Sequence, residues 1–258
     1  MCLLVLAWRA HPRYRLVLAA NRDELHARPA AALAPWSDLA GVLGGRDLEA
    51  NGAWLAADVR RRFGIVTNFR EFGRRSGPPS RGALIPAFLA QAESPGDYLR
   101  SLETSARGYA GFNLLLAERN SLWYASNRAD AFARELPPGI YGLSNEFLDT
   151  PWPKLVRVRA RFTALLDADA AAPADTLTEG LFGLLADRQT APTDTQPAAD
   201  LSPEWSRKLS APFVLDATYG TRCSTVLTIA SDETLRIAER RFDAHGEWSG
   251  QTEHVLNA

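Results

Sequence analysis

The chain has 258 residues, a formal net charge of -1 and 46% hydrophobic residues. A chain of this length can bury a large core, so a single domain over residues 1–258 is predicted. The balanced charge argues against a protein that binds nucleic acid by bulk electrostatics. Only two cysteines are present, which excludes a disulfide framework, and no cysteine or histidine spacing indicates a bound metal. No apolar run approaches the ~20 residues of a membrane-spanning helix, and no basic stretch precedes the first apolar run, so a cytoplasmic location is expected.

The first 24 residues are predicted to form a β-hairpin. Residues 2–8 form an apolar strand, residues 14–20 a second strand, and His11 lies near the centre of the turn. Opposed residues in an antiparallel pair have a constant index sum, which is about 22 to 24 for this turn. Cys2 is therefore expected opposite residues 20 to 22, roughly 5 Å away. This register brings the start of the chain to the polar run Asn21–Glu24.

The rest of the chain predicts further strands and helices in separate blocks. Strands are expected at 41–45, 53–59, 63–68, 112–117, 121–126, 139–143, 223–230 and 235–242. Helices are expected at 84–91, 94–105, from Pro151 to 166, and 176–186, the last opened by a Thr176–Glu179 capping box. Residues 70–81 are expected as a loop, residues 187–209 as a long loop or lid, and the residues after 246 as a loose tail. This order favours an α+β fold with two mostly antiparallel sheets and helices outside them.

Cys2 is the first candidate for chemistry. If Met1 is removed, Cys2 carries a thiol and an α-amine on one residue, and an α-amine of ordinary pKa accepts a proton near neutral pH. Nucleophile and base then belong to one residue, as in N-terminal-nucleophile catalysis. The alternative is a buried small side chain at a strand start, since free cysteines are commonly buried.

The run Asn21–Glu24 follows an apolar strand and is the second candidate. Arg22 would lower the pKa of a nearby thiol, and Asp23 would orient an amine. Side chains alternate along a strand, so Asn21 and Asp23 share one face and Arg22 takes the other. Either the strand bends here or only part of the set reaches Cys2. A solvated turn with local ion pairs is the alternative.

Three polar residues from distant segments complete the candidate site. Asn68 and Asn145 each end a predicted strand, where a side-chain amide can donate to a developing oxyanion. Arg222 precedes the strand at 223–230 and is a candidate for holding a substrate carboxylate or for lying beside the nucleophile. Turn formation by the asparagines and surface exposure of the arginine are the alternatives. The four histidines show no metal-ligand spacing.

Several motifs along the chain resemble those of one family. They are Met1-Cys2, Ala19–Glu24, Arg28-Pro29, Gly44–Asp47, Gly52–Leu55, Val66–Arg70, Ser80–Gly82, Gly111–Leu114, Ser126–Arg128, Tyr141–Asn145, Leu148–Lys154 and Tyr219–Arg222. With them the sequence resembles the NRDE family of transport and Golgi organisation 2 homologues. That family is similar in turn to the N-terminal-nucleophile hydrolases that include bile-salt hydrolase, penicillin V acylase and acid ceramidase.

The resemblance implies a four-layer αββα sandwich with Cys2 as nucleophile, Asn68 and Asn145 as site asparagines and Arg222 as a late site arginine. In those hydrolases the early arginine and aspartate are three residues apart. Here they are adjacent, so the roles of Asn21, Arg22 and Asp23 are left open.

Two functions follow from the resemblance. One is hydrolysis of an amide or thioester of a small acyl substrate, with no cofactor required. The other is a non-catalytic carrier of haem or an acyl lipid, with haem as cargo and a connection to lipid homeostasis. A role as an interaction protein in membrane traffic has no support from the residues. Neither nucleic acid nor a transmembrane segment is expected.

Overall fold

The computed structural model describes residues 2–71, 79–169, 174–192 and 201–257, without the side chains of residues 2, 174 and 175. The chain folds into two compact units. The first comprises residues 1–27, 138–144 and 148–258, and the second comprises residues 28–137 and 145–147. Each unit contains one antiparallel sheet, and each is described by itself. The predicted loops at 70–81 and 187–209 lie partly outside the described residues.

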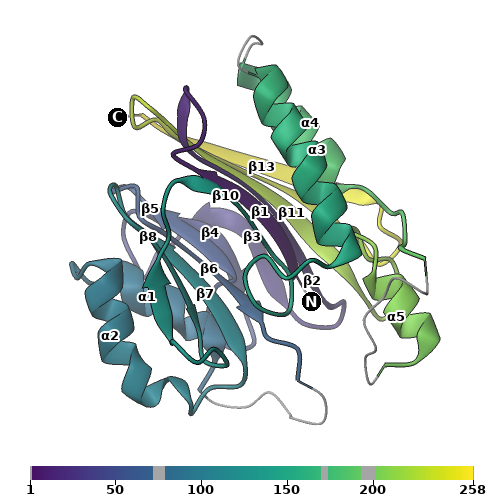
Figure 1. The fold of residues 1–258 in the computed structure, drawn as a ribbon, viewed down its shortest axis with the longest axis horizontal. Helices are drawn as coiled ribbons and strands as arrows, with labels where there is room; N and C mark the ends of the chain where they lie inside the picture. The colour runs from purple at the N-terminus through teal and green to yellow at the C-terminus, as the bar shows by residue number, and fades with distance from the viewer. Residues whose placement is uncertain (1, 72–78, 170–173, 193–200, 258) are drawn as a thin grey trace. The chain divides into compact units, whose positions relative to one another are not determined.

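The sheet of the first unit has six strands. Their order is β10 (Gly139–Leu143), β1 (Cys2–Trp8), β2 (Tyr14–Leu25), β11 (Tyr219–Ala230), β12 (Leu235–Phe242) and β13 (Trp248–Leu256), and all neighbours are antiparallel. The helices of this unit are α3 (Pro153–Asp169), α4 (Ala174–Leu185) and α5 (Pro203–Leu209). Figure 1 shows α3 and α4 side by side along this sheet. The chain start therefore lies one strand from the centre of the sheet.

The core of the first unit lies between this sheet and the pair α3 and α4. Phe162 of α3 and Leu181 of α4 are fully buried in one cluster with Val17 and Ala19 of β2. Residues 17 and 19 point to the same face because side chains alternate along a strand. By the same alternation, Leu18 is buried on the opposite face of β2. Strand β2 is thus covered on both faces, which explains its continuous apolar run.

The sheet of the second unit has seven strands in sequence order. They are β3 (Ala30–Pro35), β4 (Val42–Asp47), β5 (Leu55–Asp58), β6 (Phe63–Asn68), β7 (Phe112–Ala117), β8 (Leu122–Ser126) and β9 (Ala133–Glu135), all antiparallel to their neighbours. Between β6 and β7 the chain forms a short 3₁₀ turn at Arg81–Ala83 and the helices α1 (Leu84–Leu89) and α2 (Pro95–Ala106). Phe88 of α1 and Leu99 of α2 pack with Leu114 of β7 in one buried cluster. Figure 1 shows α1 and α2 beside this sheet.

The predicted hairpin register is confirmed. Cys2 is paired with Arg22, an index sum of 24 at the upper end of the expected range. The N-cap of α2 is confirmed as well, since the Ser94 side chain accepts a hydrogen bond from the Asp97 backbone nitrogen. The expectation of two mostly antiparallel sheets with helices is confirmed for both units.

Five expectations about elements differ from the structure. Residues 21–25 continue β2 because β1 and β11 pair with them from both sides. The residues after 246 form the edge strand β13, whose alternating partial burial the polar sequence obscures. Strands β3 and β9 were not expected, and the expected loop 187–209 ends in α5. Thr176 lies inside α4, which starts at Ala174, so it does not open that helix.

Candidate functional site

Strand β2 carries the first group of predicted site residues between two partner strands. Cys2 is paired with Arg22, and Leu3 with Asn21. Asn21 continues the series Val17 and Ala19, whose side chains pack on the helices. Arg22 therefore lies on the other face of the strand. Of the predicted run Asn21–Glu24, Arg22 is the residue directly opposite Cys2 in the neighbouring strand.

Asn21 is a buried anchor on the helix face of the sheet. Its amide nitrogen donates to the backbone oxygens of Leu185 and Pro212 at 2.9 and 3.0 Å, and its oxygen accepts from Ser224 Oγ at 2.6 Å. The two donations use both hydrogens of the amide. Asn21 thereby ties the end of α4 and the segment after α5 to β2, and its donors are engaged within the fold.

Asp23 lies on the same face and is 2% exposed. The Thr221 hydroxyl donates to Asp23 Oδ1 at 2.7 Å. Burial raises the pKa of the Asp23 carboxyl, while the positive charge of Lys154 and the hydrogen bond from Thr221 lower it. A buried carboxyl of raised pKa beside a cation is typical of functional sites as well as of structural networks.

Lys154 is the residue of this cluster that the sequence reasoning missed. It lies near the start of α3, is 3% exposed, and its Nζ donates to the Leu209 carbonyl oxygen at 2.8 Å. Buried lysines are rare unless they are paired. The sequence contained a signal that could have identified it: Lys154 and Lys208 are the only lysines in the chain, whose other basic residues are arginines and histidines.

A β-bulge in β11 decides where Arg222 lies. Asp23 is paired with Thr221, and Arg22 with Cys223, so Arg222 is the extra residue. Thr221 and Ser224 both reach the helix face, where they bond Asp23 and Asn21. Strict alternation would place residues 221 and 224 on opposite faces. Arg222 and Cys223 therefore occupy the other face together, opposite the single residue Arg22.

We call Arg22, Arg222 and Cys223 the arginine face. Arg22 is 6% exposed, and its Nη2 lies 4.0 Å from Glu24 Oε2. Arg222 donates from Nη1 to the Leu25 carbonyl oxygen at 2.8 Å. Burial lowers the pKa of Arg222, and the positive charge of Arg22 lowers it further, so the two guanidinium groups act on each other. Cys223 is a buried cysteine that forms no disulfide.

The second unit brings Asn68 and Asn145 together. Asn145 is 2% exposed, and its side-chain nitrogen donates to the Asn68 backbone oxygen at 2.8 Å. The Asn145 backbone oxygen accepts in turn from the Arg70 nitrogen at 2.7 Å. Burial lowers the pKa of Arg70. Two segments of the second unit that are far apart in sequence are thus joined through one amide.

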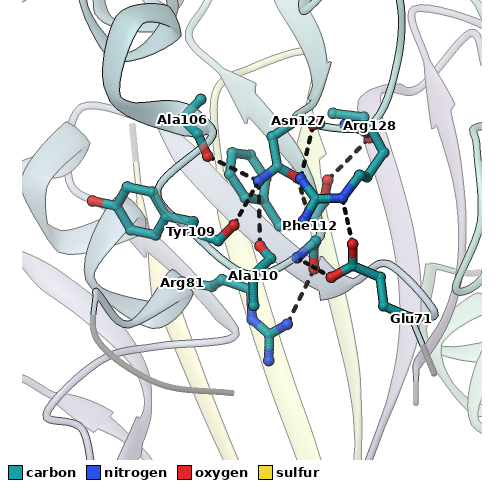
Figure 2. A network of polar contacts seen from close by, with 10 residues as sticks. Glu71, Arg81, Ala106, Tyr109, Ala110, Phe112, Asn127 and Arg128 are labelled. Carbon is teal, nitrogen blue, oxygen red and sulfur yellow. Dashed lines mark hydrogen bonds and ion pairs between the residues drawn. The ribbon is translucent and has the colours of Figure 1, made fainter. Parts of the chain in front are cut away.

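A polar network beside α2 accounts for other motif residues of the second unit (Figure 2). Asn127 donates to the backbone oxygens of Ala106, Tyr109 and Ala110 and accepts from the Phe112 nitrogen. Arg128 pairs with Glu71, which accepts from the Gly111 nitrogen, and Arg81 donates to the Gly111 oxygen. These contacts join the end of α2 to the start of β7, so this network has a structural role.

The predicted residues therefore fall into two groups. The first unit contains Asn21, Arg22, Asp23 and Arg222. Asn21 and Asp23 lie on one face of its sheet, and the two arginines lie on the other face. Asn68 and Asn145 belong to the second unit. Cys2 is placed through its backbone register alone. Across the described ranges, no three His, Cys, Asp or Glu side chains gather as a metal site requires.

Fold and site define an α+β protein of two antiparallel sheets, each packed against helices, with a buried polar cluster on the central strand β2. The chain belongs to the Transport and Golgi organisation 2 family, whose sequence model matches residues 1–244. It is 32% identical to the mouse transport and Golgi organization 2 homolog, over 93% of this chain and 92% of that protein. The human homolog is 30% identical, over 93% and 92%, and the Drosophila melanogaster protein is 26% identical, over 96% of each chain.

Two solved structures are similar to this one. The first is the Caenorhabditis elegans ortholog of N-acylethanolamine-hydrolyzing acid amidase, with a TM-score of 0.49 and 13% identity over 88% of this chain and 92% of that chain. The second is the C2A mutant of conjugated bile acid hydrolase from Clostridium perfringens, with a TM-score of 0.47 and 7% identity over 100% of this chain and 92% of that chain. Over the part of the chain that the structure describes, no helix is long and apolar enough to cross a membrane.

Proposed function

We propose that this chain is a cysteine hydrolase of amides or thioesters in which Cys2 is the nucleophile. The observation that supports it is the register of the hairpin. It sets the Cys2 backbone opposite Arg22, which precedes Asp23, a residue with a buried carboxyl. After removal of Met1 the Cys2 backbone nitrogen becomes an α-amine, which needs an acidic partner to orient it. Asp23 fits that role. The positive charge of Arg22, which is paired with Cys2, favours the thiolate form of the Cys2 side chain.

The proposed reaction has two steps. The Cys2 sulfur attacks the carbonyl carbon of the acyl group, forming a C–S bond, and the C–N or C–S bond to the leaving group breaks. The α-amine takes the thiol proton and passes it to the leaving group. Water then attacks the acyl-enzyme thioester, which releases the carboxylic acid and restores the thiol. The oxyanion role that the resemblance implies for Asn68 and Asn145 stays a prediction, because these residues belong to the second unit.

Labelling with an acyl-donating probe tests the nucleophile. We expect the intact mass of the purified protein to lack Met1, and an alkyne-bearing β-lactone to add a single acyl group. The label is lost in Cys2→Ala and retained in Cys223→Ser. The second variant is the matched control because Cys223 is the only other thiol and is 4% exposed. Retained Met1, or a label that persists in Cys2→Ala, contradicts the proposal.

The arginine face also favours a second candidate, a carrier of haem or an acyl lipid. Two guanidinium groups on one face suit the propionates of haem. In this case haem is cargo, and no covalent attachment is expected because the sequence has no CxxCH motif. A haem titration followed by Soret absorbance tests the carrier, with Cys2→Ala alongside. The absence of a Soret shift at micromolar haem contradicts it.

A further inference from the structure

Lys154 places a buried ammonium group on the helix face of the first unit. It belongs to α3, which covers this face, and its Nζ donates to the Leu209 carbonyl oxygen at 2.8 Å. Burying an ammonium group is costly unless hydrogen bonds and opposite charges offset its lost hydration. The carboxyl of Asp23 lies on the same face and is buried as well. Two opposite charges are thus enclosed in one part of the fold.

The segment 209–214, which follows α5, lies against the surroundings of both charges. At its start, Leu209 accepts from Lys154. At its end, the Val214 nitrogen donates to Thr221 Oγ1 at 2.9 Å, and Thr221 donates to Asp23 Oδ1 at 2.7 Å. A hydroxyl carries one proton, so Thr221 gives its proton to Asp23 while it accepts from Val214. This arrangement suits an ionised carboxyl at Asp23, which accepts and does not donate.

The ionisation of Asp23 depends on opposing influences. Burial raises the pKa of its carboxyl, whereas the α-amine at the start of the chain, Lys154, the hydrogen bond from Thr221 and the charge of Arg22 lower it. Charge interactions weaken with distance, so the ammonium group of Lys154 acts on Asp23 from nearby. Lys154 is therefore one of the groups that favour the carboxylate against the effect of burial.

The start of the chain approaches Asp23 from the neighbouring strand. Cys2 is paired with Arg22, and β1 continues from this pair toward the lower-numbered residues of β2. The backbone nitrogen of Cys2 therefore lies toward the higher-numbered side, where Asp23 is the next residue. Neighbouring strands lie about 4.8 Å apart. After removal of Met1 this nitrogen is the α-amine of the proposed reaction.

We propose that Lys154 is a positioning residue that holds the Asp23 carboxyl ionised for the α-amine of Cys2. The role rests on the proposed function, because the amine belongs to Cys2 only after Met1 is removed. An ionised carboxyl accepts a hydrogen bond from the amine and fixes its direction, whereas a protonated carboxyl has a proton of its own to donate. Lys154 acts through Asp23 and takes no part in the breaking of bonds.

Carbon-13 NMR of the aspartate carboxyl carbons tests the effect on Asp23 directly. The signal that disappears in Asp23→Asn identifies the Asp23 carboxyl. We expect its titration midpoint to move to higher pH by about one unit or more in Lys154→Met, because a nearby positive charge stabilises the carboxylate. Lys154→Gln keeps a donor for Leu209 without the charge and should show the same shift. Lys154→Arg keeps the charge and should retain a midpoint close to that of the wild type.

The matched control is Lys208→Met, which removes the same charge from the only other lysine of the chain. The Lys208 side chain is 32% exposed and pairs with Glu204 and Asp216. We expect this variant to leave the Asp23 midpoint unchanged, and melting curves show which variants are folded. A purely structural role for Lys154 would lower stability without moving the midpoint. An unchanged midpoint in folded Lys154→Met or Lys154→Gln, or an equal shift in Lys208→Met, overturns the inference.

Labelling of Cys2 with the alkyne-bearing β-lactone separates the inference from the proposed function. We expect the acidic limb of the labelling rate to move to higher pH in Lys154→Met, with rescue in Lys154→Arg. Labelling of Cys2 with an unchanged pH profile would leave the hydrolase standing and end the positioning role. A moved midpoint in a protein whose Cys2 takes no label would end the hydrolase proposal, while the effect of Lys154 on Asp23 would stand.

Discussion

The side-chain amide of Asn145 donates a 2.8 Å hydrogen bond to the backbone carbonyl of Asn68. This bond joins two predicted site residues that stand 77 positions apart in the sequence. Because the acceptor is a backbone atom, the contact depends on the residue type at 145 and not on the residue type at 68.

Replacing Asn145 is therefore expected to cost more than replacing Asn68. Asn145→Ala removes the donor of a part-buried hydrogen bond, which should lower the free energy of unfolding by about 1–3 kcal/mol. Asn68→Ala keeps the backbone acceptor and serves as the matched control, with a smaller loss. Urea denaturation of both variants measures the difference. Equal losses would show that the bond does not stabilise the fold.

Asn21 is expected to be more important for stability than its bonded neighbour Ser224. Asn21→Ala leaves the oxygens of Leu185 and Pro212 without their donor and removes the acceptor of Ser224, so a loss of about 2–4 kcal/mol is expected. Ser224→Ala removes one of these bonds and should cost about 1 kcal/mol. Chemical denaturation checks both values. A cost for Ser224→Ala that matches Asn21→Ala would contradict the assignment of the two backbone contacts.

The pKa of Asp23 gives stability a predictable pH dependence. Burial raises this pKa above its ordinary value of 3.8, so between 3.8 and the raised value the folded protein holds a proton that the unfolded chain has released. The contribution of Asp23 to the free energy of unfolding therefore falls as pH rises through this range. Asp23→Asn removes this contribution, so its stability should fall less, or rise more, from pH 4 to pH 7 than that of the wild type.

Thermal or urea unfolding across that pH range measures the Asp23 effect. Thr221→Val is a useful companion variant, because it removes the hydrogen bond that lowers the pKa of Asp23 and should extend the fall in stability to higher pH. Parallel pH profiles for wild type and Asp23→Asn would show that this carboxyl keeps its ordinary pKa in the folded state.

Two glycines provide opposite expectations for the same substitution. A Cβ at Gly52 would lie 2.5 Å from the backbone carbon of Gly82, and backbone atoms cannot give way cheaply, so Gly52→Ala should cost more than about 2 kcal/mol. Gly183 lies in α4, and a Cβ there meets nothing within 4 Å. Gly183→Ala should stabilise the protein by about 0.5–1 kcal/mol through helix propensity. If the melting temperatures of Gly52→Ala and Gly183→Ala shift in the same direction, one of the two expectations is wrong.

Local pattern was sufficient for much of the fold. The turn near His11 fixed the hairpin register, because an antiparallel pair has a constant index sum, and the Ser94-Pro95 pair identified the start of α2. The strand β13 was missed because its side chains are polar and only partly buried. It is a strand because β12 offers backbone partners along its length.

The candidate site, too, was predicted in part by the local sequence and decided in part by strand pairing. The sequence by itself determined that Cys2 meets the run Asn21–Asp23, since the hairpin joins them through a short turn. Only the tertiary structure decided which face each residue occupies. Strand β11 comes from almost two hundred residues further along the chain, and its bulge sets Arg222 and Cys223 together opposite the single residue Arg22. Alternation within one strand cannot reveal such a bulge, because it exists only in the pairing of two strands.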